Sequence, residues 1–288
     1  MLARLKALST VALISGLALG CGPMGSQGKG GSGGGGAGSS GGGGNGGGGG
    51  SGGNGAIEGS VTASSFAAGT GTNAEAGYDV GAGFGRAGDC NVQELGPCEV
   101  SNCPASSPGS QAGTITLAGG ATTVTLTPDA TGAYPDAMGS AALWHGGESI
   151  TIRAIGNPDG VSAFMGSLQA PAAVIGTMLG NVVWPAQPMT ISRSAALTVA
   201  WNSSSAGVAI DIGPATGLHA SCVFPPGSTS GTIPAEVMMM LPAGTVYLDL
   251  SAINHQMIMA GMVPVDLALL TAGNTASGDL ASAELTLQ

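Results

Sequence analysis

One short segment near the C-terminus carries side chains that could bind a soft metal. His255, Met257 and Met259 alternate along an extended run, and Met262 follows closely. Alternate residues of a β-strand point to one face, so imidazole and thioether groups would lie together in a set soft enough to select Cu(I). Methionine also fills irregular cores, and buried packing is the interpretation that we favour here. The sequence therefore predicts no cofactor and no metal site, with periplasmic copper binding as the alternative.

Four cysteines beyond residue 55 are candidates for disulfides: Cys90, Cys98, Cys103 and Cys222. Their even number, in a chain with an export signal, favours two disulfides among three connectivities. At least one bridge must then be local, because three of the four cysteines lie within fourteen residues. Zinc is a poorer explanation, since none of the spacings is Cys-x-x-Cys and no histidine lies nearby.

The remaining candidates for catalysis or hard-metal binding are scattered. His145, His219 and His255 form no motif, and the chain has no HExxH, GxSxG, P-loop or EF-hand pattern. We therefore expect that the protein is not an enzyme, with a hydrolase that lacks a recognisable motif as the alternative. Single aspartates without EF-hand spacing are better explained as solvated surface charge than as calcium ligands. These aspartates are Asp129, Asp136, Asp159 and Asp211.

The elements that would position these residues are predicted to be short β-strands. Apolar and small polar residues alternate with the period of two that is typical of half-buried strands. Turn clusters rich in proline, glycine and asparagine separate the alternating runs. Only two short helices are expected, over 135–144 and 234–241, each beginning with proline. The alternating runs are 57–62, 113–117, 122–126, 149–155, 197–201 and 208–212.

These patterns predict an all-β ectodomain of two β-sandwich units of the immunoglobulin-like or fibronectin-like kind. We place the first unit, with the cysteine cluster, at 56–180 and the second at 181–288, because patterning weakens over 177–187. In the second unit, Leu197, Val199 and Trp201 should share the inner face of a strand.

The first twenty residues have the pattern of a signal peptide. Arg4 and Lys6 precede an apolar run from Ala7 to Leu19. At thirteen residues this run is too short to cross a membrane, which takes about 20 helical residues. We expect residues 1–20 to be removed.

The signal peptide ends in Leu17-Ala18-Leu19-Gly20-Cys21, which resembles the lipobox of bacterial lipoproteins. That resemblance implies cleavage after Gly20 and acylation of Cys21 by chains such as palmitate. Two or three acyl chains hold a protein at a membrane essentially permanently. Gly22 stands where an aspartate would favour retention at the inner membrane, so we expect the outer membrane.

Residues 21–55 consist of the lipidated cysteine and a tether of glycine with scattered serine and asparagine. This composition cannot bury apolar surface and is predicted to be disordered, with a root-mean-square reach of ~30–35 Å. The tether would hold the ectodomain away from the membrane.

The ectodomain is strongly acidic. Sixteen Asp and Glu residues face three arginines and no lysine beyond the tether, which gives a formal charge of about −13. Nucleic acid is therefore excluded as a partner, because its binding depends on clustered lysine and arginine.

Three segments resemble the Gly-tethered lipoproteins of myxobacteria: CNVQELGPCEVSNC from Cys90, LWHGGESITIRAIGN from Leu143, and SRSAALTVAW from Ser192 with the later SCVF and TIPAEVMMMLPAG. The resemblance implies a secreted β-sandwich lipoprotein and no particular activity. We expect a lipid-anchored envelope protein whose ectodomain lies in the periplasm or at the cell surface. Its role would be structural, or binding of a glycan or an envelope protein.

Overall fold

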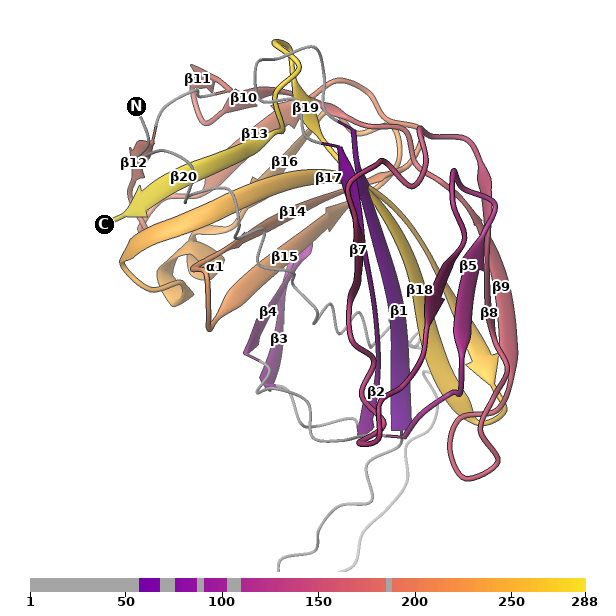
Figure 1. Cartoon of the computed structure of the whole chain (residues 1–288). Helices are drawn as coiled ribbons and strands as arrows, with labels where there is room; N and C mark the ends of the chain where they lie inside the picture. The colour runs from indigo at the N-terminus through magenta and orange to yellow at the C-terminus, as the bar shows by residue number, and fades with distance from the viewer. Residues whose placement is uncertain (1–56, 68–75, 87–90, 103–109, 185–187) are drawn as a thin grey trace, which may run out of the picture.

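The computed structural model describes residues 57–67, 76–86, 91–102, 110–184 and 188–288 (Figure 1). The predicted signal peptide, Cys21, the tether, Cys90 and Cys103 lie outside these residues. Within the described ranges the chain is almost entirely β-structure, as predicted, and none of its helices is long and apolar enough to span a membrane.

The largest sheet has eleven strands and runs through both halves of the described structure (Figure 1). Its main path has nine strands: β3 (Asn91–Leu95), β4 (Cys98–Asn102), β15 (His219–Phe224), β14 (Gly207–Gly213), β17 (Gly244–Ala260), β18 (Val263–Ala272), β1 (Ile57–Phe66), β2 (Gly77–Arg86) and β7 (Ala137–Gly139). Off this path, β20 (Ser282–Leu287) pairs with β17 and with β12 (Met189–Ile191). Most neighbours are antiparallel, but β1 runs parallel to β18.

Two smaller sheets pack against the large one. The five-stranded sheet contains β11 (Val182–Val183), β10 (Ile175–Leu179), β13 (Leu197–Trp201), β16 (Ser230–Ile233) and β19 (Asn274–Thr275). The four-stranded sheet contains β6 (Val124–Leu126), β5 (Ile115–Ala118), β8 (Ser149–Ala154) and β9 (Phe164–Gln169). The helix α1 (Ala235–Met240) follows β16.

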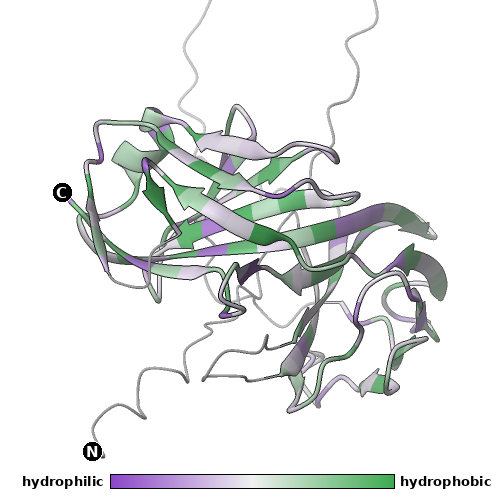
Figure 2. Ribbon diagram, turned by 90° about the horizontal axis from the view of Figure 1, so that it is seen from above, coloured by the Kyte–Doolittle hydropathy of each residue, from purple (hydrophilic) through white to green (hydrophobic). Residues whose placement is uncertain are grey.

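Each small sheet encloses a hydrophobic core with a different part of the large sheet. The core under the five-stranded sheet includes side chains from β14, β15, β17 and β20, and the core under the four-stranded sheet includes side chains from β1, β2 and β18. Figure 2 shows the alternation of hydrophobic and hydrophilic residues along the strands that makes one face of each apolar. The 17-residue strand β17 contributes to both cores, with Leu248 in one and Ala260 in the other.

Neither core is contiguous in sequence. The β3–β4 hairpin precedes residue 180, but its buried side chains lie in the core under the five-stranded sheet. Strand β18 follows residue 181, but it packs in the core under the four-stranded sheet. The division into two units at 56–180 and 181–288 stays a prediction.

The predicted strands are confirmed. All six alternating runs coincide with strands, namely β1, β5, β6, β8, β13 and β14. Leu197, Val199 and Trp201 are buried together in the core under the five-stranded sheet, as expected. The short helix expected over 234–241 is also present, with Pro234 at its N-cap position.

The prediction of a helix over 135–144 is wrong. Residues 137–139 instead form the edge strand β7, where Ala137 pairs with Val80 of β2. Gly139 is a poor helix former and lies so close to the Tyr78 ring that a Cβ there would be 2.2 Å from it. The segment ends at Trp144, whose buried indole Nε1 donates a 2.7 Å hydrogen bond to Thr271 Oγ1 on β18. Tertiary pairing therefore overrides the local signal of a proline at the first turn.

Candidate functional site on the outer face of β17

The face of β17 that points away from the two cores carries most of the candidate chemistry. Inner residues such as Val246, Leu248 and Leu250 are buried. The alternate residues form the outer face of β17, namely Tyr247, Asp249, Ser251, Ile253, His255, Met257 and Met259. One strand therefore presents carboxylate chemistry at one end and imidazole and thioether chemistry at the other.

A row of acidic and hydroxyl residues crosses the sheet through Asp249. Each member pairs directly with the next in the strand register. Directly opposed residues on adjacent strands have Cβ atoms only about 4.5–5.5 Å apart, so their side chains interact. This acidic row consists, in spatial order, of Glu94 (β3), Glu99 (β4), Ser221 (β15), Asp211 (β14), Asp249 (β17) and Ser282 (β20).

Asp211 lies at the centre of the row and is only 7% exposed. Its Oδ1 atom and the Ser221 Oγ atom are both buried without a hydrogen-bond partner. Burial raises the pKa of Asp211 to about 6, and the Asp249 charge opposite adds to this, while the Ser221 hydroxyl opposes it. The side chain of Asp249 remains exposed, but the surrounding protein displaces water from it and raises its pKa as well.

A second pair of opposed acids, Glu94 and Glu99, lies at the β3–β4 end of the row. Burial raises the pKa of Glu99 to about 7, and repulsion from Glu94 on the adjacent strand acts in the same direction. Two pairs of opposed acids therefore lie on one sheet face, and in both pairs proximity and loss of water disfavour full ionisation.

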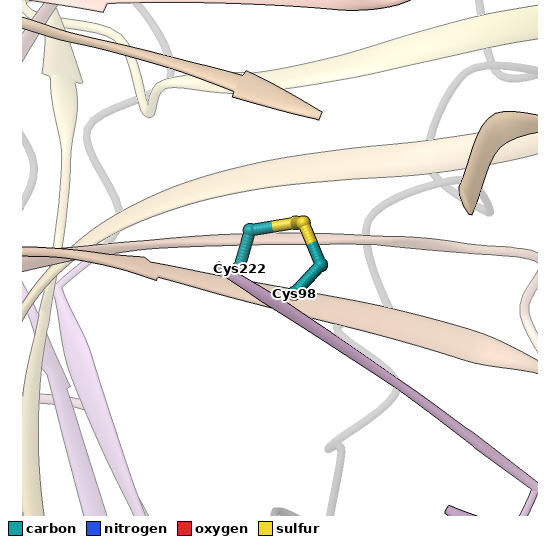
Figure 3. Close-up of a disulfide and its surroundings, with 2 residues drawn as sticks. All are labelled: Cys98 and Cys222. Atoms are coloured by element: carbon teal, nitrogen blue, oxygen red, sulfur yellow. A yellow bond between two sulfur atoms is a disulfide. The ribbon is translucent and has the colours of Figure 1, made fainter. Parts of the chain in front are cut away.

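A disulfide fixes this end of the row. Cys98 and Cys222 are directly opposed on β4 and β15 and are joined on the inner face (Figure 3). The next pair in the register is Glu99 with Ser221, on the outer face. The bridge therefore holds the hairpin that carries both glutamates in register with Asp211. It spans two distant parts of the chain, unlike the local bridge that the sequence requires if a second disulfide exists.

His219 lies beside the row on β15, two residues from Ser221 and on the same face. Its ring occupies the space above Gly213, where a Cβ would lie 2.3 Å from Nδ1. Burial lowers the pKa of His219, so its imidazole is neutral near pH 7. Ser221 Oγ and Asp211 Oδ1 make no hydrogen bond, so the described residues do not show the linked hydrogen bonds of a Ser-His-Asp triad.

The copper candidates lie at the other end of β17, and the expectation that they are buried is wrong. Met257 and Met259 are 47% and 61% exposed, and Met262, in the turn to β18, is 93% exposed. His255 Nδ1 lies 3.7 Å from the Oδ1 atom of buried Asp266, and this carboxyl raises the pKa of His255. The outer face of β17 points away from the core here, which is why these methionines do not pack in it.

A buried apolar patch separates the two ends of the outer face. It consists of Ala209, Ile253, Ala268 and Leu270, all 7% exposed or less, with Val223 packed against them. The acidic row and the histidine–methionine end are therefore two separate sites.

The aspartates that were interpreted as surface charge divide into two groups. Asp129, Asp136 and Asp159 are exposed. Asp129 Oδ1 accepts hydrogen bonds from the Thr131 hydroxyl and from the backbone of its own turn, which lowers the pKa of Asp129. Asp136 lies close enough to the buried Asp79 to help raise the pKa of that residue to about 6, after burial itself. The interpretation is wrong for Asp211, which is buried in the acidic row.

Sequence reasoning missed the row because its members are far apart in the chain. The available signal was an acid in the middle of an apolar strand, as in VAIDI around Asp211 and VYLDL around Asp249. Across the described residues, no three Asp, Glu, His or Cys side chains meet closely enough to enclose a metal ion. No family model matches the chain, and no curated protein is significantly similar to it in sequence.

Proposed function

We propose that the protein is a lipid-anchored lipoprotein of the outer membrane whose ectodomain is a binding or structural module of the cell envelope. On this proposal Cys21 carries the lipid, residues 22–55 are the tether, and the two sandwich units are of the immunoglobulin-like or fibronectin-like kind. The Cys98–Cys222 bridge supports an oxidising compartment, because disulfides persist there and are rare in the cytosol.

The acidic row on the outer face of the large sheet, with Tyr247 beside it, is the observation that carries a binding role. Six strands bring carboxylates and hydroxyls into one row, and the aromatic side chain of Tyr247, 42% exposed, lies beside it between Asp249 and Glu284. An amphipathic ring offers apolar contact, while neighbouring carboxylates and hydroxyls accept hydrogen bonds. This is the chemistry that a glycan with many hydroxyls needs.

A glycan array probed with the purified protein tests this role. We expect selective binding that is lost in Tyr247→Ala and retained in Val183→Ala, a control at an exposed apolar residue on β11. No binding to any glycan on the array, together with turnover in a hydrolase screen, would contradict the proposal and favour an enzyme.

Anchoring is tested separately by membrane fractionation. Cys21→Ser should release the protein from the membrane fraction, whereas Ser26→Ala, a change in the tether, should not. Protease treatment of intact cells, with a periplasmic protein as the leakage control, then assigns the side of the membrane. Loss of the ectodomain assigns it to the surface and protection assigns it to the periplasm.

Copper binding is a second candidate because of how His255 is oriented. Its Nδ1 faces the Asp266 carboxylate, which leaves Nε2 available beside exposed Met257 and Met259. A carboxylate behind a histidine is a common way to orient a metal ligand. Titration of reduced protein with Cu(I) against a competing chelator should show binding tighter than micromolar. Replacing Met257 and Met259 with leucine should abolish it, Met138→Leu on β7 should not, and weaker binding by the wild type rejects this candidate.

A further inference from the structure

The centre of the acidic row contains polar atoms that the fold leaves without partners. Asp211 is more than nine-tenths buried. Neither its Oδ1 nor the adjacent Ser221 Oγ makes a hydrogen bond, although the Ser221 hydroxyl lies near enough to lower the pKa of Asp211. A buried carboxylate oxygen without a partner costs free energy, so such atoms in a native protein call for an explanation. Asp249, directly opposite, adds a second negative charge.

Within the described ranges, no lysine or arginine lies on the strands of the acidic row. Of the three arginines beyond the tether, Arg86 ends β2, Arg153 lies on β8, and Arg193 donates a hydrogen bond to the Met239 backbone carbonyl. None of the three is on the six strands of the acidic row. Since none of the described strands of the row supplies a cation, a bound cation or protons are the remaining means of compensating its negative charge.

We propose that the central part of the acidic row is a binding site for a hard divalent cation of the Ca²⁺ type. Asp211 and Asp249 would provide carboxylate oxygens from the centre of the row. Ser221 and Ser282 would provide hydroxyl oxygens, because each is the next residue in the register on one side. Oxygen ligands suit Ca²⁺, which also tolerates irregular geometry and completes its shell with water.

The donor set predicts a weak site. Only two carboxylates are involved, and Asp249 and Ser282 are exposed. Extracellular calcium modules with few charged ligands have dissociation constants of about 10⁻⁴–10⁻³ M. A site of this kind would be filled or emptied by the ions outside the cell membrane. This inference does not depend on which glycan or protein the ectodomain binds.

Isothermal titration of EDTA-treated protein with CaCl₂ near pH 7.5 tests the proposal, with thermal unfolding measured in parallel. The wild type should bind one Ca²⁺ and melt at a higher temperature in its presence. Asp211→Asn and Asp249→Asn should each lose at least tenfold in affinity and lose the thermal shift. Both variants should fold, because each removes one charge from a repelling pair.

Two further variants separate ligation from general attraction to an acidic surface. Glu284→Gln removes an equal charge from the same face of β20, opposite Tyr247 and two register positions from the site, and should leave the affinity unchanged within twofold. Ser221→Ala keeps all charges but removes a proposed ligand, and should weaken binding several-fold. No Ca²⁺ binding by the wild type, or equal losses in Glu284→Gln and Asp249→Asn, would overturn the proposal.

Discussion

Removal of the Cys98–Cys222 disulfide should destabilise the ectodomain by several kcal/mol. The two cysteines are separated by 124 residues, so the bridge closes a long loop in the unfolded chain. On the chain-entropy model, a loop of that length gives about 5 kcal/mol at 25 °C. Since native disulfides commonly contribute less than this limit, we expect the Cys98→Ala, Cys222→Ala double variant to lose about 3–5 kcal/mol.

Urea denaturation of the wild type and the double variant measures this loss directly. Both cysteines are changed together, because a single replacement would leave a reactive thiol in the core. The β3–β4 hairpin should become sensitive to limited proteolysis first, since among the described strands β4 pairs with the rest of the sheet through β15 alone and β3 is the edge strand beyond it. A loss below about 1 kcal/mol at unchanged m-value, with the hairpin still resistant, would refute this reasoning.

Three further outcomes follow from buried groups and from cysteine pairing. Asp79→Asn should stabilise the protein by about 1–2 kcal/mol at pH 8 but hardly at pH 4, measured by urea unfolding. The reason is that the folded pKa of about 6 lies above the ordinary aspartate value of 3.8, so that ionisation between these pH values costs stability. Thr271→Val should lower the free energy of unfolding by about 1–3 kcal/mol, because it leaves the Trp144 indole N–H buried without an acceptor. The control Thr116→Val, at a position on β5 outside the core, should lower it by less. Disulfide mapping by mass spectrometry should find Cys98 joined to Cys222, which leaves Cys90 with Cys103 as the only pairing for a second bridge; a Cys98–Cys103 peptide would contradict this.

The strands were predictable because their signal is local. A period of two along Leu197–Trp201 or Val208–Ile212 identifies a half-buried strand, and the structure has both. The helix expected at 135–144 failed because its fate depends on β2, which pairs with Ala137 across the sheet. A local signal cannot report such a partner.

The acidic row could not be predicted because strand order is not encoded locally. Asp211 and Asp249 are 38 residues apart in sequence, and Glu99 joins them only because β4 pairs with β15. The same holds for the exposed methionines, since periodicity places Met257 and Met259 on one face without showing whether that face is the inner or the outer one. Non-local pairing decides both questions.

The most direct test of the proposed function is mass spectrometry of the N-terminal peptide of the mature protein, extracted from the membranes of cells that produce it. The proposal predicts a chain that begins at Cys21 and carries acyl groups on the cysteine. A chain that begins at another residue, or a Cys21 with a free thiol, would contradict it.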